Sequence, residues 1–215
     1  MQKDLSDYRK SYEKSKLLED AVPENPMELF QKWFHEIVAT DGLEEPNAMT
    51  VSTIGLDGFP KNRIVLLKKY TDEGFIFYTN YLSEKGKAIS KNPKVGLSFF
   101  WHHLERQVII KGQAEKIAEN LSDGYFESRP RGSQLGAIVS QQSQPIGSRT
   151  ELENNLKALE EKTEGKSLKR PKHWGGYLIK PTSLEFWQGR PNRLHDRIRY
   201  VLQKDYNWKV ERLQP

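Results

Sequence analysis

The sequence predicts an α+β protein that is mainly β with surrounding helices and is built on a small antiparallel barrel. Between residues 48 and 116, five strand-like segments follow one another through short turns. Residues 119–164 have helical patterns, and the chain returns to strand-like patterns after residue 173. A chain of 215 residues fits one domain. We place this domain at residues 25–215, behind a mobile N-terminal arm, residues 1–24, that has no sustained apolar period.

The first element is a helix that begins at Asn25-Pro26. Asparagine suits the N-cap and proline the first helical position. Apolar residues then recur at helical spacing from Leu29 to Val38, so we expect the helix to end near Thr40.

Strand-like alternation begins at Ala48. The segments AMTVSTIG and KNRIVLLKKY flank LDGF, which predicts a hairpin with Asp57-Gly58 at its turn. TDEG (71–74) turns the chain into the strand FIFYTN. SEKGKAISKN is typical of a short helix that ends before Pro93. KVGLSFFWH and RQVIIKGQAEKI then predict another hairpin.

The helical region from residue 119 to 164 is broken at SRPRG and QSQPIG, which predicts three helices. Its last piece, residues 149–164, is strongly charged, so we expect a solvated outer helix. WGGYLIKPTSLEFWQG and RIRYVLQKDYNWKVERL predict the final strands, with KDYN as the last turn.

Composition limits the possible functions. The net charge is +5, from 34 basic against 29 acidic residues, a modest excess that suits anionic ligands. The absence of cysteine excludes disulfides, thiolate metal sites and cysteine nucleophiles. No apolar run approaches the roughly 20 residues of a membrane span, and the polar N-terminus is unlike a signal peptide. We therefore expect a cytoplasmic protein with no membrane partner. A mean hydropathy of −0.78 suggests that burial needs a partner subunit.

The segment FWQGRPNRLHDR (186–197) gathers residues that a fold alone does not require. It holds Trp187, His195 and three arginines, of which Arg193 and Arg197 alternate with His195. On a strand these three would share one face. Guanidinium groups suit phosphates and carboxylates, imidazole titrates near neutrality, and indole covers flat ligands. The alternative is a solvated, charged strand end.

A second group of phosphate-binding candidates lies upstream. Arg63 and Lys68 are five residues apart, which places them on opposite faces unless a bulge or the strand end intervenes. Ser83 and Lys85 open the helix that follows Tyr78-Thr79, and a helix N-terminus binds anions. The alternatives are surface cations and an N-cap role for Ser83.

Tyr125, Arg129 and Ser133 are spaced by four, but Pro130 disfavours helix at Arg129. We therefore expect a turn between two helices that carries a monophosphate clamp, the alternative being a network that only joins the helices.

Two polar positions fit the edge of a ring ligand: Gln107, expected as a buried amide in a strand, and the loop pair Gln142-Ser143. His102-His103 would point apart on a strand and lack a third ligand, so we predict no metal site.

Nine short blocks occur in the order found in one known family. They are RIVLLK (63–68), FYTN (77–80), SEK (83–85), WHHLERQV (101–108), YFESRPRGSQLGA (125–137), QQS (141–143), HWGGY (173–177), EFWQG (185–189) and RLHDR (193–197). On these blocks the chain, from about Tyr8 to Pro215, resembles the pyridoxine/pyridoxamine 5′-phosphate oxidase family. The resemblance implies an FMN-binding split β-barrel and a homodimer with FMN at its interface. The implied reaction oxidises pyridoxine 5′-phosphate and pyridoxamine 5′-phosphate to pyridoxal 5′-phosphate, with O2 as acceptor and H2O2 released.

The resemblance also implies roles for individual residues. Those that match cofactor contacts are Arg63, Ile64, Val65, Leu66, Leu67, Lys68, Tyr78, Thr79, Ser83, Lys85, Gln107, Gln142, Ser143, Trp187 and Arg197. Those that match substrate contacts are Arg9, Tyr12, Lys68, Tyr125, Arg129, Ser133, Arg193 and His195, the last two being the catalytic candidates. Arg9 and Tyr12 lie in RKSY (9–12), which aligns with a segment that folds over the substrate. Glu84 departs from the basic residue usual in the family, which weakens one contact to the FMN phosphate.

Two other functions remain open from the residues. One is a different split-barrel FMN oxidoreductase or a flavin reductase. The other, from a different class, is a non-enzymatic basic barrel whose aromatic and basic side chains bind nucleic acid. We expect the oxidase, with no nucleic-acid partner. The flavin absorption spectrum separates it from the nucleic-acid binder, and the substrate-phosphate cluster separates it from the other flavin enzymes.

Overall fold

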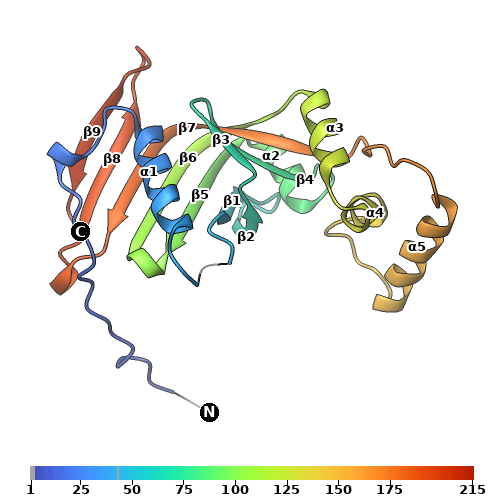
Figure 1. The fold of residues 1–215 in the computed structure, drawn as a ribbon, viewed down its shortest axis with the longest axis horizontal. Helices are drawn as coiled ribbons and strands as arrows, with labels where there is room; N and C mark the ends of the chain where they lie inside the picture. Colours follow the sequence, from blue (N-terminus) through green and yellow to red (C-terminus); the bar gives the residue numbers. More distant parts are fainter. Residues whose placement is uncertain (1–2, 43) are drawn as a thin grey trace. The chain divides into compact units, whose positions relative to one another are not determined.

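The computed structural model describes residues 3–42 and 44–215. These described residues form nine strands in one sheet, in which the order β2-β1-β5-β6-β7-β4-β3 is extended by β8 beside β7 and β9 beside β8 (Figure 1). The chain divides into two compact units. The first unit comprises Met1–Thr50, Leu97–Lys111 and Pro181–Pro215, and the second comprises Val51–Gly96 and Gly112–Lys180. Residues 1–2 of the predicted arm lie outside the described residues.

In the first unit, α1 (Pro26–Val38) begins where Asn25 predicts. The Asn25 side chain accepts a hydrogen bond from the backbone N of Met27 at 2.9 Å. The apolar face of the helix supplies Phe30, whose ring lies 5.3 Å from that of Phe99, and Trp33, which meets Phe186 edge-on at 5.2 Å. These aromatic contacts form the core of the unit.

Parts of β5, β6 and β7 and the hairpin of β8 and β9 complete the first unit. β5 (Lys94–Trp101) and β6 (Arg106–Lys116) are joined by the 3₁₀ helix η2 (His102–Leu104) and by Glu105, whose backbone is left-handed (φ 55°). β8 (Asp196–Leu202) pairs with β9 (Trp208–Leu213), and the predicted last turn closes them, with Leu202 opposite Trp208.

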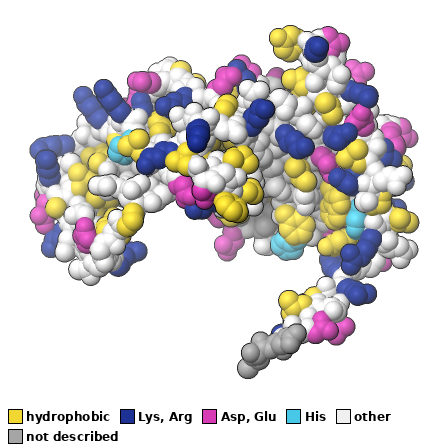
Figure 2. All heavy atoms as spheres, turned by 180° about the vertical axis from the view of Figure 1, so that it is seen from behind, with side chains coloured by type: hydrophobic (Ala, Val, Ile, Leu, Met, Phe, Trp, Pro, Cys, Tyr) yellow, Lys and Arg dark blue, Asp and Glu magenta, His cyan; other side chains and the backbone are white. Residues whose placement is uncertain are grey.

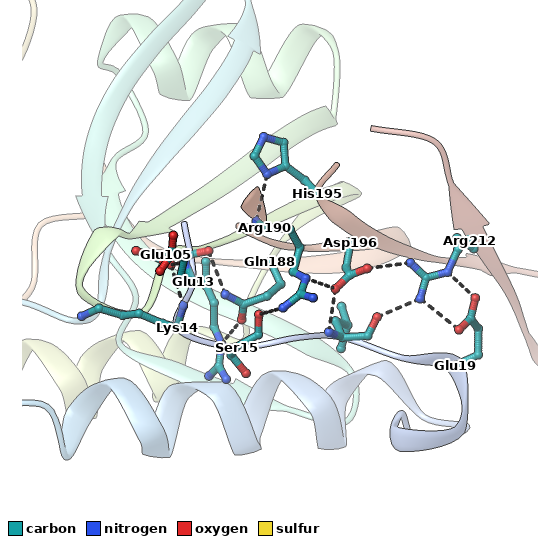
Figure 3. A network of polar contacts seen from close by, with 12 residues as sticks. Glu13, Lys14, Ser15, Glu19, Glu105, Gln188, Arg190, His195, Asp196 and Arg212 are labelled. Atoms are coloured by element: carbon teal, nitrogen blue, oxygen red, sulfur yellow. Dashed lines mark hydrogen bonds and ion pairs between the residues drawn. The ribbon is translucent and has the colours of Figure 1, made fainter. Parts of the chain in front are cut away.

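The N-terminal segment of the first unit is held by polar contacts. Residues before α1 include a short 3₁₀ helix, η1 (Glu19–Ala21), and the buried Leu17. The backbone N of Leu17 donates to Asp196 at 3.0 Å, and the guanidinium of Arg212 contacts Asp196 and Glu19 (Figure 3). These bonds use backbone groups and carboxylates rather than apolar side chains. The attachment of the segment therefore gives no apolar periodicity in the sequence.

The second unit contains the first predicted hairpin, β1 (Ala48–Ile54) and β2 (Pro60–Leu66), with Gly58 at φ +86° in its turn. The strand predicted over residues 61–70 is wrong in one respect, because it breaks after Leu66. Leu67 is buried, and a separate strand β3 (Lys69–Thr71) pairs with β4 (Gly74–Asn80). β4 also pairs antiparallel with β7 (Trp174–Gln188), from Phe75 opposite Ile179 to Asn80 opposite Trp174.

Helices flank these strands within the second unit. α2 (Glu84–Lys91) follows β4, and the predicted three helices are present as α3 (Glu119–Ser128), α4 (Arg131–Val139) and α5 (Arg149–Lys162). No residue of α5 is buried, as its charge pattern predicts. Figure 1 shows α5 beside α4.

Charged side chains are dispersed over the surface. Figure 2 shows Lys and Arg side chains scattered among Asp and Glu across the face in view, rather than gathered in one patch. Within residues 3–42 and 44–215, no helix is long and apolar enough to cross a membrane.

Candidate functional site

A cavity of about 650 Å³ lies in the second unit, where the ends of β2 and β4 meet the start of α2 and the junction of α3 with α4. Its lining includes three cationic side chains, Lys68, Lys85 and Arg129. Among the described residues that line it there is no carboxylate. The chain has 29 acidic residues, yet every charged side chain described in the cavity lining is a cation, which favours an anionic ligand.

The end of β2 forms one wall of the cavity. Ile64, Val65 and Leu66 line it, and Lys68 also reaches it because the strand ends at Leu66. Because β2 ends at Leu66, strand alternation no longer places Arg63 and Lys68 on opposite faces. Arg63 itself donates from Nη1 to the carbonyl of Val51 at 3.2 Å and to Thr53 Oγ1 at 2.8 Å.

Lys85 points its ammonium group at two polar side chains of the cavity. Its Nζ donates to Thr79 Oγ1 at 3.0 Å and to Gln142 Oε1 at 3.1 Å. Burial, together with the positive charge of Arg63, lowers the pKa of Lys85 to about 8. Glu84, the residue that departs from the family pattern, forms an ion pair with Lys61 at 2.6 Å. A phosphate beside Lys85 would stabilise the charged form of this lysine and raise its pKa.

Ser83 caps α2 and is fully buried. Its Oγ accepts a hydrogen bond from the backbone N of Gly86 at 3.2 Å and donates to the carbonyl of Asn80 at 2.6 Å. The N-cap alternative for Ser83 is therefore present in the structure, and its hydroxyl is already used inside the turn.

Arg129 lies at the junction of α3 and α4, in the turn that Pro130 predicts. Its backbone is extended (φ −76°, ψ 148°) between the two helices. The guanidinium carbon lies 4.6 Å from the ring centroid of Trp174, a cation–π contact. Its Nη1 is buried and has no hydrogen-bond partner among the described residues. Because buried guanidinium donors normally bind an acceptor, Arg129 calls for an anion in the cavity.

Aromatic rings stack beside Arg129, around the indole of Trp174 that its guanidinium contacts. Tyr78 stacks on Tyr125 with ring centroids 3.9 Å apart and on Trp174 with centroids 5.4 Å apart. Burial raises the pKa of Tyr78, so its phenol stays neutral. Sequence reasoning missed Trp174, although it lies in the block HWGGY, because nothing in that block shows which side chain the indole supports.

A second group of predicted residues lies in the first unit. The ring of Trp187 is 4.7 Å from that of His195, and Tyr12 lies edge-on to Trp187 at 5.7 Å and 5.8 Å from His195. His195 Nδ1 accepts a hydrogen bond from the backbone N of Arg190 at 3.1 Å. Burial and the charge of Arg193 lower the pKa of His195, so the imidazole is neutral near pH 7.

The prediction that Arg193, His195 and Arg197 share one strand face is wrong. β8 begins only at Asp196, and Arg193 ends a short 3₁₀ helix, η3 (Pro191–Arg193), with a left-handed backbone at φ 62°. Arg193 is exposed. Arg197 is on the strand opposite Trp187, and it donates to Glu185 Oε1 and to the carbonyl of Gln214, both at 2.8 Å.

The buried amide was assigned to the wrong glutamine. Gln107 is only half-buried, on the face of β6 opposite Val108 and Ile110. The fully buried amide is Gln188, which accepts from Arg106 Nε at 2.9 Å and donates to the carbonyl of Leu104 at 3.1 Å. Strand alternation alone cannot predict which of two glutamines on neighbouring strands is the more deeply buried.

The remaining candidates are dispersed. Ser143 is exposed with a left-handed backbone (φ 71°), and Arg9 is exposed, with its Nε donating to the carbonyl of Ser6 at 3.0 Å. The cavity brings together Ile64, Val65, Leu66, Lys68, Tyr78, Thr79, Lys85, Tyr125, Arg129, Ser133 and Gln142. The ring cluster of the first unit brings together Tyr12, Trp187 and His195.

Two family profiles match this sequence. Residues 36–162 match the family described as pyridoxamine 5′-phosphate oxidase, and residues 174–215 match the pyridoxine 5′-phosphate oxidase C-terminal dimerisation region. A Flavobacterium psychrophilum protein named pyridoxine/pyridoxamine 5′-phosphate oxidase is 69% identical over 213 residues, which cover 99% of this chain and 100% of the relative. A Christiangramia forsetii protein of the same name is 53% identical over 215 residues and all of both chains.

Solved structures confirm the predicted fold class, an α+β split β-barrel of the FMN-binding type. PhzG from Burkholderia lata 383, in complex with tetrahydrophenazine-1-carboxylic acid, has a TM-score of 0.85 and 28% identity, covering 91% of this chain and 95% of its own. A pyridoxamine 5′-phosphate oxidase-related, FMN binding protein from Nostoc punctiforme has a TM-score of 0.70 and 14% identity, covering 87% and 96%.

Proposed function

The chain belongs to the pyridoxine/pyridoxamine 5′-phosphate oxidase family, and from that premise we propose that it oxidises pyridoxine 5′-phosphate and pyridoxamine 5′-phosphate to pyridoxal 5′-phosphate. The relatives that carry this name align over the full length of the chain, at 69% and 53% identity. The family, with its FMN-binding neighbour, implies a flavin cofactor. We propose that this flavin is FMN.

The observation that carries the proposal is the unpartnered guanidinium of Arg129. It lies in a cavity with Lys68 and the hydroxyls of Tyr125 and Ser133. A phosphate monoester offers several acceptor oxygens and about −1.5 to −2 charges near neutral pH. In the proposed complex these four side chains bind the substrate phosphate, and the donors of Arg129 gain the acceptor that the described residues do not supply.

The upstream residues fit the phosphate of FMN. Burial lowers the pKa of both Arg63 and Lys85, and the charge of Arg63 lowers that of Lys85 further. Two partly desolvated cations are stabilised by an anion, which is the chemistry of a flavin phosphate site. Thr79, Gln142 and the backbone of residues 64–66 would hold the rest of the cofactor. The role of Ser83 is to build the helix start that positions Lys85.

When bound, the flavin would supply a two-electron acceptor for substrate carbon C4′, with O2 as the final acceptor and H2O2 as its product. In our proposal, Trp187 and Arg197 contact the flavin, and Arg193 and His195 contact the substrate ring. Because Nδ1 of His195 accepts from the backbone N of Arg190, the neutral ring carries its proton on Nε2, which would donate a hydrogen bond to the substrate. Arg193 would orient the oxygen or nitrogen at C4′ and stabilise negative charge as the proton leaves. Alignment of this kind is worth about 100-fold in rate.

A phosphate-free substrate is the competing hypothesis, because PhzG was solved with a tetrahydrophenazine carboxylic acid. The identity to PhzG is 28%, against 69% to the Flavobacterium oxidase. Three cations around one cavity also favour a phosphate over a single carboxylate.

Aerobic turnover tests the proposal. The purified protein is loaded with FMN and mixed with each phosphorylated vitamer, and pyridoxal 5′-phosphate and H2O2 are quantified. Equal amounts of the two products are expected from both vitamers, with ammonia released only from the amine. The proposal fails if the loaded protein oxidises neither vitamer, or if it takes unphosphorylated pyridoxine equally well.

A further inference from the structure

Two residues without an assigned role, Glu105 and Gly189, lie under the N-terminal segment of the first unit. Glu105 occupies the left-handed position after η2, and its side chain is 2% exposed. Its Oε2 accepts hydrogen bonds from the backbone N of Glu13 at 2.9 Å and of Lys14 at 3.0 Å (Figure 3). Its Oε1 pairs with Lys10 at 3.3 Å. A buried carboxylate thus binds the backbone of the two residues that follow Tyr12 and the ammonium group of Lys10, two residues before it.

Gly189 leaves the space that Tyr12 fills. A Cβ atom added at Gly189 would lie 2.8 Å from both Cβ and Cγ of Tyr12, and 3.1 Å from Cβ of Glu105. The backbone N of Gly189 donates to the carbonyl of Glu105 at 2.8 Å. The two residues therefore form one surface, and only a glycine lets the Tyr12 ring lie this close to it.

The segment is fixed again beyond Tyr12. Arg190 donates from Nη1 to the carbonyl of Ser15 at 3.0 Å, and Asp196 accepts from the backbone N of Leu17 at 3.0 Å. These bonds leave Tyr12 with its ring against Trp187 and His195. The contacts on both sides of Tyr12 leave its backbone little freedom.

We propose that Glu105 and Gly189 are positioning residues that seat Tyr12 on Trp187 and His195, so that residues 10–14 cover the substrate ring. The carboxylate fixes the backbone just after Tyr12 and pairs with Lys10 before it, and the missing side chain at position 189 admits the aromatic ring. The kinetic part of this inference rests on the proposed function, whereas the seating of the segment does not.

Limited proteolysis of the full-length, FMN-loaded protein tests the seat itself. Trypsin cleavage after Lys14 is timed in Glu105→Gln and Gly189→Ala. We expect it to be about tenfold faster or more than in the wild type, because a lost charged hydrogen bond is worth roughly one factor of ten in an opening equilibrium. Two matched controls should cleave at the wild-type rate. Glu115→Gln removes an exposed carboxylate paired with Lys180, and Gly124→Ala adds a Cβ where nothing lies within 4 Å.

A double-mutant cycle tests the role in catalysis. Tyr12→Ala should raise KM for pyridoxamine 5′-phosphate about fivefold, since an aromatic contact is worth roughly that factor, and leave kcat nearly unchanged. Glu105→Gln and Gly189→Ala should each raise KM similarly, but should add less than about twofold in the Tyr12→Ala background.

Wild-type cleavage rates in both variants would overturn the seat. If Glu105→Gln or Gly189→Ala raises KM by the same factor with and without Tyr12→Ala, the positioning role is overturned. If Glu105→Gln does not fold, Gly189→Ala decides both measurements. If the wild type oxidises no vitamer, the proposed function fails, and the cleavage rates still decide whether Glu105 and Gly189 hold the segment.

Discussion

Arg129 combines three features that are rarely found together in a structural arginine. It is partly buried, it lies over an indole ring, and one of its nitrogens has no partner among the described residues. The cation–π contact with Trp174 stabilises the charge without using the donors at the guanidinium edge. Arg129 lines the cavity, and its Nη1 lacks a partner among the described residues, so a bound phosphate would supply the missing acceptor.

Replacing Arg129 should therefore weaken binding of the phosphorylated substrate selectively. Arg129→Ala is expected to raise KM for pyridoxamine 5′-phosphate by tenfold or more, because losing a charged hydrogen bond costs about 1.5–3 kcal/mol. Steady-state kinetics with and without the substrate phosphate measure the effect. Arg131→Ala is the control, since the Arg131 guanidinium binds the carbonyls of Thr163 and Lys166 instead. Equal KM changes in the two variants would contradict the clamp.

In the proposed FMN site, we expect Lys85 to make the FMN affinity dependent on pH. With a pKa of about 8 in the free protein, it loses its charge as the pH rises through 8, whereas a bound phosphate holds the proton on. FMN binding therefore takes up a proton above pH 8, and the affinity for FMN falls by roughly tenfold between pH 8 and 9.5. The same depressed pKa makes the free protein more stable as the pH rises from about 8 toward the normal lysine value.

Flavin fluorescence titrations between pH 7 and 9.5 measure this dependence. Lys85→Arg should keep the affinity and lose most of the pH dependence, because arginine stays protonated throughout this range. A wild-type affinity that is constant over the range, or an unchanged slope in Lys85→Arg, would exclude Lys85 as the responsible group.

At the scale of elements, the start of α2 combines a side-chain N-cap with full burial, because Ser83 is 0% exposed. Ser83→Ala removes two hydrogen bonds from a fully buried turn, so we expect the free energy of unfolding to fall by about 1–2 kcal/mol. Urea denaturation measures this loss. Ser148→Ala, at the exposed N-cap of α5, is the comparison and should cost less, about 0.5–1 kcal/mol. Equal losses at the two caps would contradict the importance of burial at Ser83.

Local signals predict most of the elements. Asn25 starts α1 because its side chain caps the helix, Gly58 turns the first hairpin because glycine adopts positive φ without strain, and Pro130 separates α3 from α4 because it disfavours helix at Arg129. The same signals predict the turn that carries Arg129. Local chemistry is sufficient wherever one residue determines the conformation.

Other features depend on contacts between distant segments, and the sequence does not predict them. Strand alternation fails at Arg193 because Asn192 and Arg193 both adopt left-handed backbones, which neither side chain requires. The contacts of the N-terminal segment depend on Glu105 and Asp196, 91 and 179 residues away from their partners Lys14 and Leu17. The indole of Trp174 acts on Arg129 only once β7 and α3 are in place.

At the scale of the whole molecule, each compact unit holds its own group of candidate residues. The second unit contains the cation-lined cavity, and the first contains the ring cluster of Tyr12, Trp187 and His195. Family membership explains why one chain carries both groups, since the proposed reaction needs a phosphate site and an aromatic site.

The region that matches the dimerisation profile, residues 174–215, includes Trp187, His195 and Arg197. We expect a two-fold homodimer, the commonest closed assembly, with FMN at its interface. Light scattering of the FMN-loaded protein should give the mass of two 25.0-kDa chains. A monomer that retains full turnover would contradict this arrangement.

The central claim is that this chain uses a flavin to oxidise a B6 vitamer that it holds by the phosphate. Anaerobic mixing of the FMN-loaded protein with pyridoxamine 5′-phosphate tests it most directly, with the flavin absorbance followed in a single turnover. We predict complete loss of the oxidised flavin absorbance, with one pyridoxal 5′-phosphate formed per flavin, and little loss at the same concentration of pyridoxamine. A flavin that stays oxidised with the phosphorylated vitamer, or is reduced equally fast by both, would contradict the account.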